Sequence, residues 1–165
     1  MEQTLRLAQN LNEGRLEVRL VGQIDEVADY SRVDFNSVKI ASFDLEGVTL
    51  INSTGLQRWI TFLESIPSQI KISFERCPAR MINQINLFPG FLGGQDIDIS
   101  SFYAPYFCDS CDAAHSVLLK TREAFPERKN PRAPVVNCPK CAARMDFDGL
   151  ESKYFLFLTF DAPGK

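Results

Sequence analysis

Histidine is nearly missing from this chain, in which His115 is the only one among 165 residues. Nucleophilic catalysis by serine or cysteine relies on a neighbouring general base, most often histidine, so few residues could perform it here. The sequence also lacks a glycine-rich phosphate-binding loop and a Ser/His/Asp arrangement. We therefore predict that the protein is not an enzyme, and we assign no catalytic residues.

Long apolar runs are missing as well. No stretch approaches the roughly 18 apolar residues that a membrane-spanning helix needs. The first residues, MEQTLRLAQN, lack the basic segment and apolar core of a signal peptide. The composition is that of an ordinary globular domain, with 45% hydrophobic residues, 24% charged residues and a net charge of -3. We expect a cytoplasmic protein without a membrane span.

Cysteine is scarce in the first part of the chain, where Cys77 stands alone, whereas four cysteines form two C-x-x-C pairs later. In a reducing compartment such pairs are more often metal ligands than disulfides. The two-residue gap lets one tight turn aim both thiolates at a metal, and two such turns complete a tetrahedron with no open position. Cys77 is predicted to be a small buried apolar residue. We predict one structural zinc ion bound by Cys108, Cys111, Cys138 and Cys141.

Charge and cysteine content both change near residue 100. Residues 1–99 hold 9 Lys/Arg and 13 Asp/Glu, whereas residues 100–165 hold 9 Lys/Arg and 8 Asp/Glu. We therefore predict two units, one over residues 1–100 and a small module over residues 101–165.

The first unit alternates between strand and helix patterns. Alternating apolar residues on both sides of Glu13-Gly14 predict a β-hairpin. The segment opened by Asp25, DEVADYSRVDF, has a weaker helical spacing and is expected to be a short helix. A strand is predicted over Val38–Leu45. A turn is expected at Glu46-Gly47, after which the short apolar segment VTLI should run back.

Two amphipathic helices are expected after that strand. The first covers residues 55–66 and is stopped by Pro67, and the strand IKISFERC that follows should run parallel to the preceding one. Pro78 opens the second helix, PARMINQINLF, before an alternating strand, QDIDISSFY. The predicted class is α/β, a small mixed sheet with helices packed on one face.

The segment LINSTGLQRW, residues 50–59, places two hydroxyls just before the first helix. Thr54 with Gln57 fits a capping box, which leaves Ser53 without a local role. A phosphate on Ser53 would meet the free amides and positive dipole of a helix N-terminus. The sequence allows both a plain helix cap and a regulatory phosphorylation site.

The strand VKIASFDLEGVTLI followed by NSTGLQRWITFLESI resembles the STAS domain, the family of anti-sigma-factor antagonists. In partner-switching members, an anti-sigma kinase phosphorylates the first hydroxyl of a D-S-[ST]-G segment, which corresponds to Ser53, and the phosphate releases the kinase. Asn52 stands where the family usually has aspartate. The resemblance implies a STAS-like fold and a signalling protein that docks a kinase or another protein near Ser53 and helix 55–66. The docking surface would also include Asn52, Thr54, Gly55 and Arg58.

The second unit resembles a zinc ribbon. Its cysteine pairs are flanked by the strand-like segments FYAPYF, SVLLK, APVVN and KYFLFLTF, and the charged insert TREAFPERKNPRA is expected to be a loop or a long hairpin arm. His115 is expected at the surface or beside the metal ligands rather than among them. A zinc ion would fold a segment too small for a robust core of its own.

Two other functions remain open. A nucleic-acid-binding adaptor would act through basic residues of the ribbon, although nearby acids favour a solvated loop. A redox sensor would use one C-x-x-C pair with a thiol of lowered pKa. The basic residues that a nucleic acid would contact are Lys120, Arg122, Arg128, Lys129, Arg132, Lys140 and Arg144. The oligomeric state does not follow from the sequence.

Overall fold

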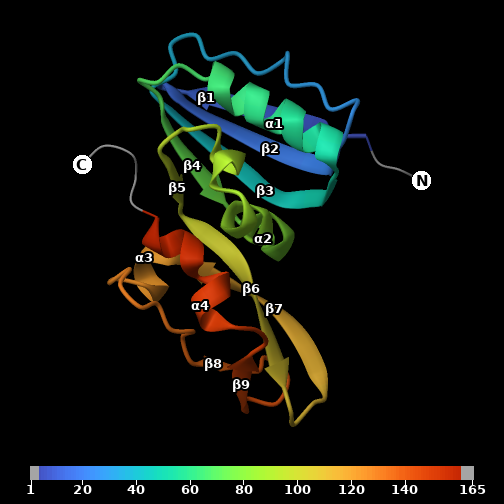
Figure 1. The fold of residues 1–165 in the computed structure, drawn as a ribbon, viewed down its shortest axis with the longest axis vertical. Coiled ribbons are helices and arrows are strands. Elements are labelled where there is room, and N and C mark those ends of the chain that lie inside the picture. The colour runs from blue at the N-terminus through green and yellow to red at the C-terminus, as the bar shows by residue number, and fades with distance from the viewer. Residues whose placement is uncertain (1–3, 161–165) are drawn as a thin grey trace.

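The computed structural model describes residues 4–160 and contains two β-sheets with helices around them (Figure 1). The first sheet has the strand order β1-β2-β3-β4-β5 and the second has the order β7-β6-β9-β8. This confirms the predicted α/β class with an additional small β-sheet. The strands are β1 (Arg6–Asn12), β2 (Arg15–Ile24), β3 (Ile40–Ile51), β4 (Lys71–Glu75), β5 (Ile97–Ile99), β6 (Ser101–Cys108), β7 (Ala113–Lys120), β8 (Val136–Asn137) and β9 (Arg144–Phe147). The helices are α1 (Ser53–Ser65), α2 (Ala79–Leu87), α3 (Thr121–Ala124) and α4 (Glu151–Tyr154), with 3-10 turns η1 (Pro89–Leu92) and η2 (Leu156–Thr159).

The predicted hairpin is confirmed as β1 and β2, which pair antiparallel up to Asn12 and Arg15. Both residues of its turn have positive φ, 48° at Glu13 and 79° at Gly14, as a two-residue turn between right-twisted strands requires. Leu16, Val18 and Leu20 of β2 are buried, and the residues between them face solvent. One face of the first sheet is therefore polar.

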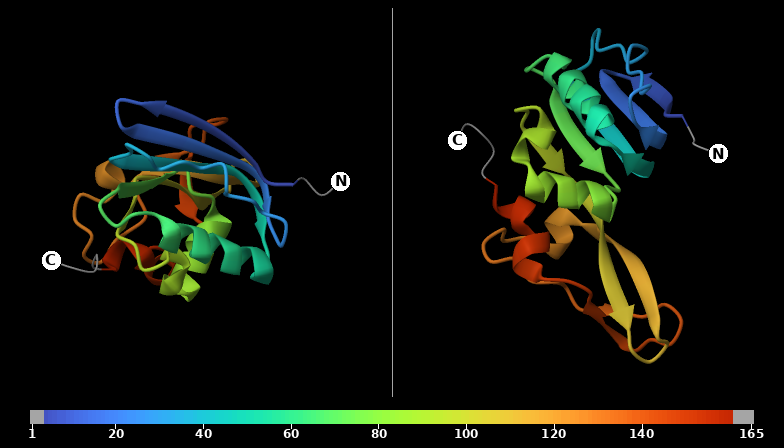
Figure 2. Two further views of the ribbon diagram at one scale, coloured as in Figure 1. Left: turned by 90° about the horizontal axis from the view of Figure 1, so that it is seen from above. Right: turned by 45° about the vertical axis from the view of Figure 1, so that its right-hand side comes forward.

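Helices cover the other face of this sheet. Figure 2 shows α1 and α2 on the same side of it, and β4 pairs with β3 in parallel after the α1 crossover, as predicted. The core between sheet and helices is aromatic. Trp59 of α1 is fully buried, with ring centroids 5.6 Å from Phe74 and 6.1 Å from Phe91. Cys77 is also fully buried, which confirms its predicted character.

The expected helix after Asp25 is wrong, because the structure has turns there. The carboxylates of Asp25, Asp29 and Asp34 each accept a hydrogen bond from the backbone amide two residues later, at 2.9 to 3.0 Å. Such local bonds give the backbone an alternative to helical hydrogen bonding. Three aspartates at short intervals therefore produce a loop over residues 25–39.

The expected turn at Glu46-Gly47 is wrong as well, because β3 continues through it to Ile51. The register with β2 shifts between Arg19 and Val21, so the break in the pattern is a β-bulge rather than a reversal. A Cβ on Gly47 would lie 2.7 Å from the carbonyl oxygen of Leu20, which explains the glycine.

The segment QDIDISSFY, expected as one strand, is divided between the two sheets. β5 ends at Ile99 and β6 begins at Ser101, while Ser100 donates from its amide to Phe74 of β4 at 2.9 Å. The expected C-terminal strand KYFLFLTF is wrong, because these residues form α4 and η2. Their apolar run packs as a short helical segment against α2 and β6.

Phe102 of β6 is the centre of that packing. Its ring lies 5.0 Å from Phe157 and 6.2 Å from Phe155, measured between centroids. Asn86 of α2 adds two hydrogen bonds of 2.8 Å, donating to the carbonyl of Tyr154 and accepting from the amide of Phe157. These contacts, which no local sequence pattern indicates, connect the C-terminal helices to α2.

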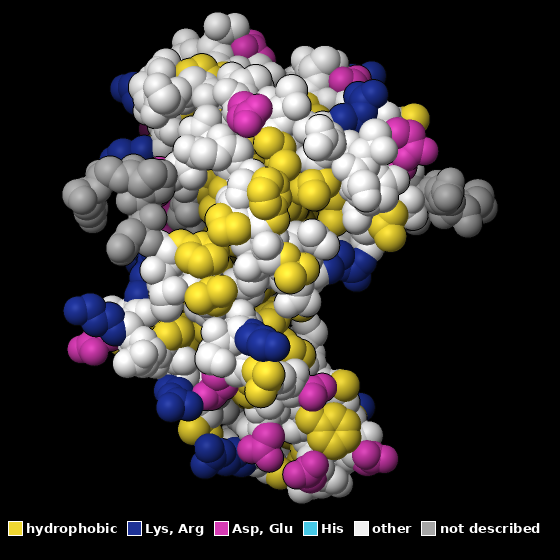
Figure 3. Space-filling view, viewed as in Figure 1, with side chains coloured by type: hydrophobic (Ala, Val, Ile, Leu, Met, Phe, Trp, Pro, Cys, Tyr) yellow, Lys and Arg dark blue, Asp and Glu magenta, His cyan; other side chains and the backbone are white. Residues whose placement is uncertain are grey.

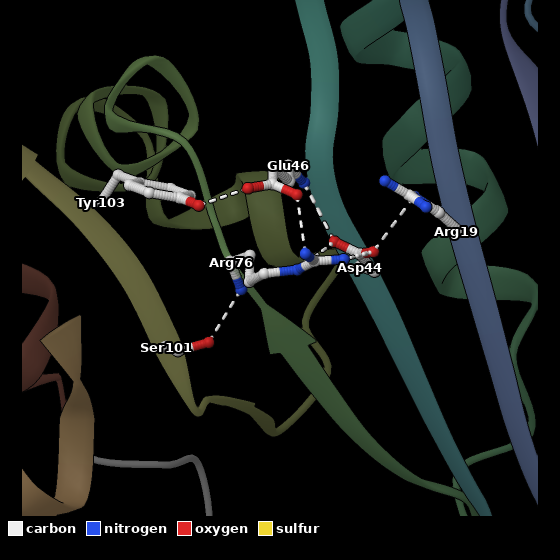
Figure 4. A network of polar contacts seen from close by, with 6 residues as sticks. All are labelled: Arg19, Asp44, Glu46, Arg76, Ser101 and Tyr103. Carbon is white, nitrogen blue, oxygen red and sulfur yellow. Dashed lines mark hydrogen bonds and ion pairs between the residues drawn. The ribbon is translucent and has the colours of Figure 1, made fainter. Parts of the chain in front are cut away.

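A polar network also joins the two sheets (Figure 4). Arg76, which follows β4, pairs with Asp44 and contacts Glu46 of β3 at 2.7 Å. Its amide donates to Ser101 Oγ at 2.8 Å, and the hydroxyl of Tyr103 donates to Glu46. The middle of β3, the end of β4 and the start of β6 are thereby held together.

No helix in residues 4–160 is long and apolar enough to cross a bilayer.

Candidate docking surface and metal centre

Asn52 begins helix α1. Its backbone is extended, and its Oδ1 accepts a hydrogen bond from the amide of Gly55 at 2.8 Å. This is the geometry of an N-cap that satisfies one of the free amides of the first turn. The predicted capping box of Thr54 with Gln57 is therefore wrong, because the helix begins at Ser53, earlier than expected. Ser53 is the first helical residue, and its hydroxyl is not the cap.

The same asparagine contacts the loop that follows β2. Asn52 Nδ2 donates to Glu26 Oε2 at 3.0 Å, and this bond is the main cause that lowers the pKa of Glu26. Farther along α1, Arg58 Nη1 donates to the carbonyl of Ala28 at 3.4 Å. The loop thus lies along the first turns of α1, an arrangement that sequence reasoning missed because it expected a helix there.

Gly55 is buried, and its contacts explain why no side chain is present. A Cβ there would lie 1.9 Å from the carbonyl oxygen of Ile24, a backbone atom at the end of β2. The amide of Asn52 donates to that same oxygen at 3.1 Å. Gly55 therefore allows α1 to pack closely on β2, and it presents no surface to a partner.

The other candidate residues are exposed on one side of the α1 N-terminus, namely Asn52, Ser53, Thr54 and Arg58. Two apolar side chains are also exposed, Val27 by 59%, which follows Glu26, and Leu50 by 44%, which precedes Asn52 by two residues. A hollow of about 490 Å³ lies beside this surface, between the loop and α1. Tyr30 forms its floor by stacking on Phe62, with ring centroids 4.4 Å apart.

The four cysteines predicted as ligands lie together at the far end of the second sheet. Their sulfur atoms are all within 4.8 Å of one another. Cys108 Sγ is 3.6 Å from Cys141 Sγ, and Cys111 Sγ is 3.9 Å from Cys138 Sγ. A tetrahedral ion with metal–sulfur bonds of about 2.3 Å separates its sulfurs by about 3.8 Å. The cluster therefore fits a tetrahedral metal ion.

Both C-x-x-C turns have the same local form. The residue after the second cysteine has a left-handed backbone in each, with φ of 49° at Asp112 and 62° at Ala142. This conformation is uncommon outside glycine and reverses the chain around the thiolates. The two turns close the hairpin of β6 with β7 and the segment between β8 and β9, respectively. Residues far apart in sequence thus come together at one centre.

The thiols of the cluster do not ionise alike. The neighbouring Cys141 sulfur and burial raise the pKa of Cys111. At Cys138 burial opposes ionisation, but the backbone amides of Cys141 and Lys140 outweigh it and lower the pKa to about 6. His115 Nε2 lies 3.7 Å from Cys138 Sγ, beside the ligands rather than in the tetrahedron. That position matches the expectation for the histidine.

The basic residues of the second unit are largely paired with acids. Arg122 and Arg128 each lie 3.3 Å from Asp98. Lys120 contacts Glu123 at 3.1 Å, and Arg132 contacts Glu151 at 2.9 Å. Figure 3 shows positive and negative side chains interspersed over the lower half of the face that it draws. Mixed charge of this kind weakens the phosphate attraction on which a nucleic-acid-binding surface depends.

Neither protein-family models nor curated protein sequences match this chain. Among solved structures, an anti-sigma factor antagonist from Mycobacterium paratuberculosis superposes on part of it. The two share 18% sequence identity with a TM-score of 0.47, and the alignment covers 58% of this chain and 86% of that one. A likeness this distant does not extend that protein's function to this chain.

Proposed function

We propose that this chain is a non-enzymatic regulatory protein that docks another protein, of the anti-sigma-factor or serine-kinase type, on the surface around Ser53. The observation that carries the proposal is that Asn52, and not Ser53, caps the start of α1. Asn52 caps the helix, so the exposed hydroxyl of Ser53 is left for a partner or a kinase. The resemblance of NSTGLQRW to the STAS phosphorylation segment supports the same residue.

The docking surface has the mixed character expected of a protein interface. Exposed polar residues begin α1, and exposed apolar side chains occur in the segments on either side of the contact between Asn52 and Glu26, at Leu50 and Val27. Apolar side chains surrounded by polar ones are the usual composition of an interface in proteins that also exist without their partner. Arg58 adds a positive charge, which suits a partner with an acidic contact region.

Phosphorylation of Ser53 would act on this surface through charge. A phosphoserine carries about -1.5 to -2 charges at neutral pH. The amides of the first helical turn would stabilise it in place. The carboxylate of Glu26, which accepts a hydrogen bond from Asn52, already places one negative charge beside Ser53. The added phosphate would therefore make the surface strongly acidic. An acidic partner would then be repelled, which gives a switch without a change of fold.

We further propose that Cys108, Cys111, Cys138 and Cys141 bind one zinc ion. Four thiolates fill the coordination sphere, so the ion is structural and offers no open position for catalysis. Its role is to hold the ends of β6, β7, β8 and β9 together in a unit over residues 101–165, beside the docking unit over residues 1–100. Cysteines kept as metal ligands fit a reducing compartment and hence a cytoplasmic location.

Native mass spectrometry of the protein purified from its own source tests the proposal. We expect one zinc ion per chain, a phosphorylated fraction at Ser53 and a co-purifying protein. Cross-linking should place that protein at Val27, Leu50 or Arg58. A partner that cross-links only to the second unit would refute the docking surface.

A further inference from the structure

Strand β7 is a long, open sheet edge. It forms the end of the second sheet, where all eight of its residues pair with β6 on one side. On its other side no strand pairs with it in the part of the chain that the structure describes. Figure 1 shows β7 along one margin of the second sheet.

The usual protections of an edge strand are absent from β7. Natural edges are blocked by prolines, bulges or charged side chains that prevent another strand from pairing. The sequence AAHSVLLK has no proline and a single charged residue, Lys120 at its end. Its register with β6 is continuous, and Leu118 is 42% exposed. An unprotected, mostly apolar edge of this length is a surface for pairing.

The backbone groups that face this open side can be identified from Pro105 of β6, which pairs with Ser116. Pro105 has no N–H, and its carbonyl accepts from the amide of Asp148 at 2.9 Å, on the side away from β7. The Pro105–Ser116 pair therefore exchanges no hydrogen bonds, and the N–H and C=O of Ser116 point outward. By the two-residue period of a strand, those of Ala114 and Leu118 do so as well.

These outward groups are self-complementary. In an antiparallel pair of two β7 strands, each outward-facing residue must oppose another one. A two-fold axis at Ser116 meets this condition, because Ser116 then opposes its own copy and Ala114 opposes Leu118.

We propose that the protein forms a symmetric dimer in which the β7 strands of two copies pair antiparallel around Ser116. The two four-stranded sheets become one continuous sheet. About six backbone hydrogen bonds join the copies, two for each opposed pair of outward-facing residues. On the outer face, Leu118 of one chain packs beside Ala114 of the other. The docking surfaces around Ser53 lie outside this interface, so the dimer presents both of them.

Sedimentation equilibrium of the full chain tests the dimer. We expect the wild-type protein to be a dimer at micromolar concentration, and Ser116→Pro to be at least tenfold weaker in dimerisation. The proline removes an outward N–H but leaves the bonds to β6 intact, and proline is tolerated on edge strands. Ser116→Ala is the matched control, since it keeps the N–H and should remain dimeric.

The register has its own test. Ala114→Lys combined with Leu118→Lys should weaken the dimer at least tenfold, because the two new lysines oppose each other across the interface, whereas Ala114→Lys combined with Leu118→Asp should remain dimeric. Zinc content and circular dichroism show that each variant is folded. The proposal would be overturned if the wild-type protein were still monomeric at about 100 μM. It would also be overturned if a folded Ser116→Pro variant dimerised as strongly as the wild type.

Discussion

The side chain of Asn52 makes two different hydrogen bonds at once, donating to Glu26 Oε2 at 3.0 Å and accepting from the amide of Gly55 at 2.8 Å. Only a side chain with both a donor and an acceptor can do this. An aspartate could cap the helix, but it would bring a second carboxylate against Glu26. The position at which this chain departs from the STAS pattern therefore has a structural reason.

We predict that Asn52→Asp lowers the melting temperature at pH 7, because two carboxylates then face each other at hydrogen-bond distance. Replacing Glu26 by glutamine in the same chain should recover the loss, because an amide can donate to the new carboxylate. Thermal unfolding of the two single variants and the double variant measures the coupling. Equal losses in the presence and absence of Glu26 would show that the two side chains do not interact.

The pH dependence of this coupling has a definite sign. The bond from Asn52 lowers the pKa of Glu26 below its ordinary value. Its contribution to stability is therefore complete above the unfolded-state pKa, and it is lost as the pH falls through the folded-state pKa. The difference in melting temperature between Asn52→Asp and the wild type should shrink as Glu26 becomes protonated.

The helix cap gives a second prediction. Asn52→Ala should reduce the free energy of unfolding by about 1 kcal/mol, the usual cost of losing an N-cap. Thr54→Ala should change it by less than about 0.5 kcal/mol, because an exposed side chain that caps nothing contributes little. Urea unfolding of both variants compares them directly. A larger loss at Thr54 would reinstate the capping box.

Removal of the metal gives a third prediction. Cys138→Ser should bind less than one zinc ion per chain and unfold at a lower temperature than the wild type, since metal binding and folding are coupled. Cys77→Ala is the control, because Cys77 is buried outside the cluster and should leave the zinc content at one. Elemental analysis and thermal unfolding provide both measurements. Acidification should release the ion, because protons compete for the thiolates.

The reactivity of the four thiols toward an oxidant separates the zinc site from the redox alternative. A structural site keeps its four thiols unreactive toward a mild oxidant while the ion is bound. A metal-free protein that forms a reversible disulfide within one C-x-x-C pair would favour a redox sensor instead.

Patterns that depend on the burial of one face were predicted well. The hairpin around Gly14 and the helix containing Trp59 follow from alternation and helical spacing, and the four-cysteine cluster follows from cysteine spacing. Each strand, helix and C-x-x-C turn among them is specified within a short stretch of chain, and no distant segment competes with it.

The wrong predictions have other causes. At Asp25, where the spacing predicts a helix, local side-chain bonds to the backbone form turns instead. The bulge at Gly47 depends on the neighbouring strand β2, which the sequence of β3 does not reveal. The C-terminal apolar run becomes helical where it packs on Phe102 and Asn86. A short apolar run is ambiguous between strand and helix until its packing partner is known.

The central claim is that a partner docks on the surface around Ser53, and the affinity of the co-purified partner for defined variants tests it most directly. Isothermal titration should show that Ser53→Glu binds at least tenfold more weakly than the wild type, a loss of about 1.4 kcal/mol or more. Ser53→Ala should bind like the wild type. Ser68→Glu is the matched control, because it adds the same charge at an exposed position beyond the other end of α1. Equal affinities of Ser53→Glu and the wild type would contradict the account.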